Sequence, residues 1–157
     1  MTASDFRHTM KALNDFGNFI VTNYKSELEA EQMTNGQLYS TIRYSVSTGT
    51  GGWVISVSLE KYWKYIEYGR RPGKMPPLDV IEKWIDVKQI KPHSMTLKSG
   101  KTVIPTIPQL SFLIARSIGR RGIGPKPLFK KSFEAAKQQF MQVIEDAIVQ
   151  DIKESLG

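Results

Sequence analysis

Helical periodicity at both ends of the chain is the sequence feature that most limits its fold. Over residues 5–31, apolar side chains recur at spacings of three and four, which is the pattern of one buried helix face. The same spacing runs from Pro127 to Leu156. Both stretches are longer than an average globular helix, so the fold needs a layer that covers two long apolar faces. We expect Ser4 to cap the first helix and Gly17 to mark a weak point within it.

Between these two helices the periodicity changes to two, which predicts strands. Leu38, Ile42, Tyr44 and Val46 share one parity over 38–46, and alternate residues are apolar again over 53–59. Many of these residues are β-branched or aromatic. The glycine-rich segment 47–52 separates the two runs, so we expect an antiparallel hairpin with one face on the N-terminal helix. The predicted fold class is therefore α+β, a small antiparallel sheet packed against long N- and C-terminal helices.

The middle of the chain predicts shorter elements and one irregular segment. Three shorter helices are expected, over 61–68, 77–87 and 109–119. Residues 88–107 fit no regular pattern beyond a small hairpin around the turn Lys98–Lys101, and loops of this length are often functional. The length of 157 residues predicts a single domain over 1–157, in which 88–107 is an irregular insertion.

Positive charge is concentrated in the middle of the sequence. Residues 61–131 hold sixteen basic and four acidic side chains, net +12, whereas residues 1–60 carry −2 and residues 132–157 carry −3. Such a block predicts a surface suited to nucleic acid or to an acidic protein face, and a solvated surface without a partner is the alternative. No acid occurs between Phe112 and Phe133. That stretch contains six residues that we call the basic cluster: Arg116, Arg120, Arg121, Lys126, Lys130 and Lys131.

The charges along the last predicted helix are arranged unfavourably for its dipole. Its first turn is basic and its C-terminal half is mostly acidic, which is the reverse of the arrangement that a helix dipole favours. We therefore expect the lysines at the start of this helix to interact with a partner.

Few residues of this sequence could support catalysis. The absence of cysteine excludes a disulfide framework, a thiolate metal site and a cysteine nucleophile. The two histidines, His8 and His93, give little basis for a histidine cluster. Ser99–Thr102 matches only the end of a phosphate-binding loop, because Met95 stands where the motif needs glycine and Pro105 follows too closely for a helix. We predict that the protein is not an enzyme and binds no cofactor.

Two carboxylates of the predicted helix 77–87 are candidate metal ligands. Glu82 and Asp86 are four residues apart, so they can share a face and bind a hard cation. The flanking Lys83 and Lys88 favour the alternative, a solvated helix face with ordinary charge pairs. We therefore predict no metal site.

The sequence predicts neither a membrane span nor a signal peptide. No apolar run approaches the ~20 residues that cross a bilayer. The N-terminal residues include an early acid and no apolar segment. We therefore expect no association with a membrane.

One acid stands among four aromatic residues in the segment Tyr62–Gly69. Burial of Glu67 without a partner would be costly, so we expect it to accept hydrogen bonds from nearby backbone or from a basic group. We also expect Tyr65 or Tyr68 to pack on the sheet. Catalysis by Glu67 is the alternative, but no second acid or base stands beside it in the sequence.

Three short motifs follow one another along the chain. They are a glycine–leucine–small–isoleucine run in Asn35–Ile42, an aromatic–acid–aromatic–glycine signature after the second predicted strand, and a proline–phenylalanine pair at the start of the last helix. The residues that carry them are Gly36, Leu38, Ile42, Tyr65, Glu67, Tyr68, Gly69, Pro127 and Phe129. In this order they resemble a bacteriophage family, the head–tail joining or tail-completion (neck) proteins of tailed phages, of the lambda-like minor tail protein type.

This resemblance implies a function as well as a fold. Members of the family are non-enzymatic ring subunits in the neck, so it implies a virion structural protein that joins the DNA-filled head to the tail. It implies a homo-oligomeric ring, a hexamer or a dodecamer, that contacts other phage neck and tail proteins and is assembled in the cytoplasm of the host bacterium. The basic cluster would then lie between subunits or face genomic DNA without sequence specificity. A small basic nucleic-acid-binding module is the alternative function.

Overall fold

The computed structural model of this chain describes residues 6–34, 36–61 and 63–157. These residues belong to two compact units. The first unit comprises Met1–Glu67 and Pro127–Gly157, and the second comprises Tyr68–Lys126. The length predicts a single domain over 1–157, and this stays a prediction.

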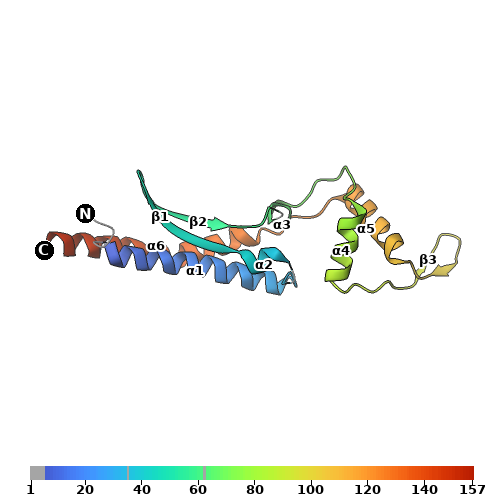
Figure 1. The fold of residues 1–157 in the computed structure, drawn as a ribbon, viewed down its shortest axis with the longest axis horizontal. Coiled ribbons are helices and arrows are strands. Elements are labelled where there is room, and N and C mark those ends of the chain that lie inside the picture. The colour runs from blue at the N-terminus through green and yellow to red at the C-terminus, as the bar shows by residue number, and fades with distance from the viewer. Residues whose placement is uncertain (1–5, 35, 62) are drawn as a thin grey trace. The chain divides into compact units, whose positions relative to one another are not determined.

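Two long antiparallel helices form the base of the first unit (Figure 1). They are α1 (Arg7–Ala30) and α6 (Leu128–Leu156), so both terminal helices predicted from the periodicity are confirmed. Their direction follows from contacts at both ends. The Arg7 guanidinium at the start of α1 pairs with Glu154 near the end of α6, and Lys131 near the start of α6 pairs with Glu27. Ser4, Asn35 and Tyr62, which entered the sequence predictions, lie outside the described residues.

The helix α1 is continuous at Gly17, where we expected a weak point. The helix runs through this position without a break, and Gly17 is buried. The ring of Tyr44 lies against it so closely that a Cβ atom on residue 17 would overlap the ring. Glycine is therefore used here for a close approach between the helix and the sheet.

A two-stranded antiparallel hairpin covers the helix pair in the first unit (Figure 1). It consists of β1 (Arg43–Gly49) and β2 (Gly52–Ser58), in which Tyr44 is opposite Val57 and Val46 is opposite Ile55. These four side chains are half-buried, whereas the alternate residues are exposed, as the period of two predicts. The predicted hairpin and the α+β fold class are confirmed.

The first part of the strand predicted over 38–46 is wrong. Gln37–Thr41 forms a short helix, α2, in which the Thr41 hydroxyl donates a hydrogen bond to the Gln37 carbonyl at 2.6 Å. Leu38 and Ile42 are both buried in one core cluster. Because residues four apart share a face in a helix and also share the parity of a strand, their spacing did not distinguish the two structures.

A third helix, α3 (Trp63–Tyr68), closes the core of the first unit. Trp63 and Ile66 pack against the cluster of Tyr24, Leu28, Leu38, Ile42 and Leu128. Tyr65 and Tyr68 are instead 59% and 71% exposed, so the expectation that one of them packs on the sheet is wrong. The reason is helical geometry, since residues 63, 66 and 67 share one face of α3 and the two tyrosines lie on others.

The second unit is built on a pair of helices (Figure 1). In it α4 (Leu78–Val87) packs on α5 (Ile107–Arg121) through Ile81, Ile85 and Ala115. The predicted small hairpin is confirmed as β3 (Met95–Thr96) and β4 (Thr102–Val103). The helix predicted over 109–119 starts earlier because Thr106 and Gln109 form a capping box and Pro108 is tolerated in its first turn.

Candidate functional site

The basic cluster is divided between the two compact units. Arg116, Arg120, Arg121 and Lys126 belong to the second unit, whereas Lys130 and Lys131 belong to the first. All six side chains are exposed. Lys131 has a partner within its own unit, because its ammonium group lies 2.9 Å from the Glu27 carboxylate of α1. The six residues are therefore not one surface of one compact unit.

A short β-bridge brings a second basic segment to the end of α5. Arg70 N–H donates to the Ile123 carbonyl, and Ile123 N–H donates to the Arg70 carbonyl, both at 2.8 Å. One turn back along α5, Gly73 N–H donates to the Gly119 carbonyl at 2.7 Å. The segment Arg70–Lys74 therefore runs along the last turn of α5, although about 50 residues separate the two in sequence.

Two glycines with positive φ make this close approach sterically allowed. Gly122 has φ +74°, and a Cβ atom there would overlap the Arg70 carbonyl oxygen. Gly69 has φ +72°, and a Cβ atom there would overlap the Ile123 carbonyl oxygen. Both lie in the left-handed region that L side chains rarely adopt. Gly69 ends α3 as predicted, and its lack of a side chain also allows the backbone to approach the Ile123 carbonyl.

The bridge places the backbones of two basic segments side by side, and we call their basic residues together the arginine surface. Its residues are Arg70, Arg71, Lys74, Arg116, Arg120 and Arg121. Within the described part of the chain, none of these six side chains has an ion-pair partner. The sequence prediction placed Arg116, Arg120 and Arg121 in one cluster with three lysines that follow them. It did not include Arg70, Arg71 and Lys74, which precede α4. A backbone bridge between distant segments has no local sequence signal beyond its glycines.

The two compact units differ sharply in charge. The second unit holds twelve basic and three acidic side chains, net +9, in residues 68–126. The remaining residues, which make up the first unit, hold ten basic and twelve acidic side chains, net −2. The boundary between the two units therefore coincides closely with the change in charge along the chain.

Glu67 is the acid that satisfies the start of α6. Its side chain is 4% exposed, and its two carboxylate oxygens accept hydrogen bonds from the backbone N–H groups of Phe129 and Lys130, each at 2.8 Å. The N-cap residue, Pro127, has no side-chain acceptor of its own. A carboxylate at this end also offsets the helix dipole. The prediction that Glu67 accepts backbone hydrogen bonds is confirmed.

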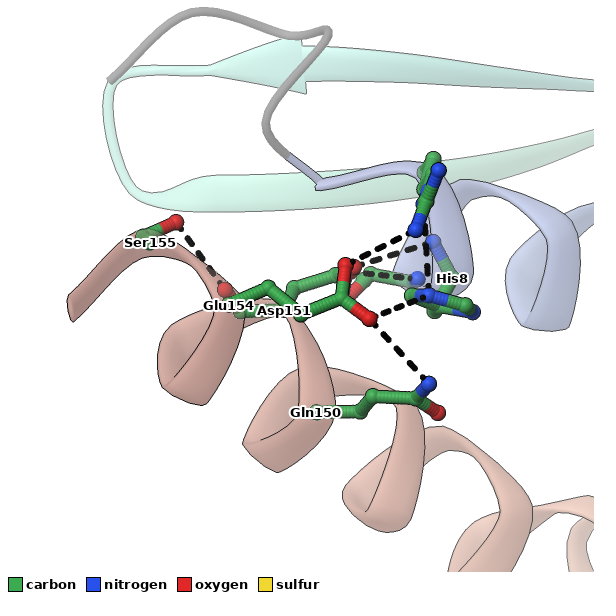
Figure 2. A network of polar contacts seen from close by, with 7 residues as sticks. His8, Gln150, Asp151, Glu154 and Ser155 are labelled. Atoms are coloured by element: carbon green, nitrogen blue, oxygen red, sulfur yellow. Dashed lines mark hydrogen bonds and ion pairs between the residues drawn. The ribbon is translucent and has the colours of Figure 1, made fainter. Parts of the chain in front are cut away.

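Asp151 accepts hydrogen bonds from the first turn of α1, as Glu67 does from the first turn of α6 (Figure 2). It is fully buried, and it accepts hydrogen bonds from His8 N–H at 3.1 Å, from Thr9 N–H at 2.7 Å and from the Thr9 hydroxyl at 2.7 Å. Burial raises the pKa of Asp151, but the hydrogen bonds from Thr9 and His8 outweigh burial and hold the pKa below its usual value. The N-cap residue, Phe6, has no acceptor side chain.

His8, Asp151 and Glu154 form the group with the spacing of metal ligands. One ligand atom from each lies within 4.8 Å of the other two (Figure 2). The Arg7 guanidinium, 3.1 Å from Glu154, already supplies a positive charge there, and both Asp151 oxygens accept hydrogen bonds. The group is therefore explained as a helix-capping network. His8 lies more than 140 residues from Asp151 and Glu154, so spacing in the sequence could not reveal the group. Within the described residues, Glu82 and Asp86 belong to no such group.

An apolar groove lies in the first unit between the sheet and α6. Its volume is about 570 Å³, and its walls include Phe16 of α1, Ile55 and Val57 of β2, and Phe129 and Phe133 of α6. The residues that line it carry no ionisable side chain. The groove therefore offers packing area and no acid–base chemistry.

Comparison with known proteins adds no relative: no family model, no curated protein and no solved structure matches this chain. Among the described residues, no helix combines the length and the apolar character that a membrane span requires.

Proposed function

We propose that this chain is a non-enzymatic structural subunit of a tailed-phage virion, one that forms a ring at the head–tail junction. One observation carries the proposal. Glu67, from the aromatic–acid–aromatic–glycine motif, hydrogen-bonds the backbone at Phe129, from the proline–phenylalanine motif 62 residues later. Leu38 and Ile42, from the first motif, share a core cluster with Leu128. Motifs that build one scaffold are suited to an architectural protein and need no catalytic role.

Ring formation requires two different surfaces on each subunit. In a head-to-tail contact, one surface of a subunit meets a different surface of its neighbour, and rotation closes the ring. The compact units supply surfaces of opposite net charge, +9 and −2. The two-stranded hairpin also leaves its outer strand edges unpaired within the described residues. These features support a repeating contact between copies, in the hexamer or dodecamer that the resemblance implies.

Assembly on tails tests this proposal directly. The full-length protein is purified, its mass in solution is measured by light scattering, and it is imaged by negative-stain electron microscopy alone and mixed with tails. We expect rings, or rings that form at the head-proximal end of tails. A protein that stays monomeric at every concentration and does not add to tails would contradict the proposal.

A second candidate function is a small basic nucleic-acid-binding module. The observation that favours it is the arginine surface, whose six side chains lack ion-pair partners in the described part of the chain. A module of this kind would bind nucleic acid as a monomer and would not join particles. The imaging experiment therefore separates the two functions.

A further inference from the structure

We propose that the arginine surface of the second unit binds the phosphate backbone of duplex DNA without reading base sequence. The surface consists of Arg70, Arg71, Lys74, Arg116, Arg120 and Arg121. The inference rests on the proposed function only for the source of the DNA, the genome that passes the head–tail junction. The binding itself is a property of the second unit.

Electrostatics explains why an anion is favoured at this surface. Residues 68–126 carry net +9, and their three acids, Asp79, Glu82 and Asp86, all lie on α4. Cationic groups brought together by the bridge repel one another unless solvent or anions separate them. A polyanion would relieve this repulsion and release its own counterions on binding.

The density of negative charge favours phosphates over carboxylates. Five of the six side chains are arginines, whose planar guanidinium groups donate two parallel hydrogen bonds to a phosphate or a carboxylate alike, so the spacing of the acceptors decides between them. From Arg116 to Arg121 the axis of α5 rises about 7.5 Å. Duplex DNA presents about four phosphates over that length. An acidic protein surface would have to hold several mutually repelling carboxylates at the same density.

The chemistry of the surface also favours a duplex over a single strand. Single-strand binding proteins stack bases on aromatic side chains that alternate with basic ones. No aromatic residue lies between Arg70 and Lys74 or between Arg116 and Arg121, so none alternates with the basic residues, and the exposed Tyr68 and Phe112 lie outside both segments. Contacts to the phosphate backbone alone position a duplex and carry no sequence information. Such contacts suit DNA of any sequence that passes the head–tail junction.

Part of the surface is assembled by the glycine bridge, which makes its geometry testable. The Arg70 guanidinium donates a hydrogen bond to the Lys74 carbonyl at 3.0 Å, so the two ends of the Arg70–Lys74 loop are in contact. Gly122 allows that loop to lie on the end of α5. A side chain at position 122 would move Arg70, Arg71 and Lys74 away from the three arginines of α5 without changing the net charge.

The first experiment measures binding of the full-length protein to a fluorescent duplex of mixed sequence, by anisotropy, between 50 and 200 mM NaCl. Six phosphate contacts predict a log–log slope near −5, so affinity should fall about a thousandfold over this range. Duplexes of different sequence should bind alike. Absence of binding at 50 mM NaCl would overturn the inference, and so would a slope between 0 and about −1.

Two matched charge reversals then locate the binding surface. Arg120→Glu with Arg121→Glu alters the arginine surface, whereas Lys98→Glu with Lys101→Glu alters the exposed turn between β3 and β4 by the same charge. The first pair should weaken DNA binding at least about fiftyfold at 100 mM NaCl, since each lost phosphate contact costs nearly tenfold there. The second pair should weaken it less than fivefold. Equal losses in the two pairs would refute a localised surface.

Gly122→Ala provides a test of geometry at constant charge. We expect it to weaken DNA binding about tenfold or more and to lower the salt slope by one to three contacts, with the far-ultraviolet circular dichroism unchanged. If this variant does not fold, Arg70→Gln with Arg71→Gln replaces it and should lower the slope by about two. An unchanged slope in the folded variant would refute the participation of the Arg70–Lys74 loop.

The outcomes distinguish this inference from the proposed function. Wild-type protein that joins tails but does not bind DNA refutes this inference alone. Protein that binds DNA with the predicted slope but never assembles refutes the proposed function alone. An arginine-surface variant that loses ring assembly and keeps DNA binding assigns the surface to a neighbouring subunit and overturns the inference.

Discussion

In the first compact unit the buried carboxylates each accept hydrogen bonds from the start of a helix, whereas in the second unit the six side chains of the arginine surface have no ion-pair partners in the described part of the chain. Glu67 and Asp151 come from distant parts of the sequence and satisfy backbone N–H groups that no local side chain satisfies. In the described part of the second unit, the arginine side chains make one hydrogen bond within the unit, from Arg70 to the Lys74 carbonyl.

This difference separates the charges that stabilise the folded protein from the charges that are available to bind a partner. A buried carboxylate that accepts backbone hydrogen bonds is part of the folded structure, so its loss must reduce stability. An exposed cation among other cations contributes repulsion, so its loss should leave stability unchanged or raise it slightly. The four predictions that follow test this division, from the largest expected effect to the smallest.

Replacement of Glu67 by alanine should produce the largest loss of stability. It leaves the N–H groups of Phe129 and Lys130 without their acceptor in a part-buried site and removes an anion from the positive end of α6. We expect the free energy of unfolding to fall by about 2–4 kcal/mol, measured by urea denaturation. Glu134→Ala, an exposed acid on the same helix, is the control and should change it by less than about 0.5 kcal/mol. Equal stability of both variants would refute the capping role.

Replacement of Asp151 by asparagine should reduce stability less, and in a way that depends on pH. The pKa of Asp151 in the folded protein lies below its unfolded value of about 3.9, so the folded state binds fewer protons than the unfolded state between these two values. The stability that the carboxylate contributes is therefore present above pH 4–5 and is lost as the pH falls through the folded pKa.

The measurement is urea denaturation of wild type and Asp151→Asn from pH 7 to pH 3. The two stabilities should converge towards the acidic end of this range. Thr9→Val, which removes one hydrogen bond and keeps the carboxylate, should retain the acid dependence of wild type in weakened form. A constant difference between wild type and Asp151→Asn across the range would show that the charge of Asp151 plays no part.

Removal of the ion pair between Lys131 and Glu27 should have a small effect. The Lys131 side chain is 68% exposed and that of Glu27 is 20% exposed, so solvent screens their attraction. A double-mutant cycle of Lys131→Ala and Glu27→Gln should give a coupling free energy of at most about 1 kcal/mol. DNA binding should not change in either variant. A large loss of DNA affinity with Lys131→Ala would place this lysine with the arginine surface.

Charge reversal at Arg120 and Arg121 should have the smallest effect on stability. Neither side chain contacts an acid in the described structure, and both are exposed. We expect the free energy of unfolding to change by less than about 0.5 kcal/mol, or to increase slightly as repulsion is relieved. A loss of 2 kcal/mol or more, measured by urea denaturation, would show that these arginines are structural, and the comparison of the two units would fail.

Much of the fold could be predicted from the sequence because it depends on local periodicity. The apolar spacing of α1 and α6, the alternation in β1 and β2 and the turn at Lys98–Lys101 each express contacts that neighbouring residues make together. The prediction failed where one spacing fits two structures, at Leu38 and Ile42, and where the exposed face of a short helix had to be chosen, at Tyr65 and Tyr68.

The candidate site could be predicted only in part. The sequence alone determined that the middle of the chain is basic and that Glu67 needs a hydrogen-bonding partner. Only the tertiary structure decided that the partner of Glu67 is the start of α6, that Asp151 holds the start of α1, and that Arg70–Lys74 lies beside Arg120. Charge is a property of composition and is visible along the chain. Pairing across about 50 to 140 residues depends on how helices, sheet and glycine bridge meet in space, and no local pattern of side chains records it.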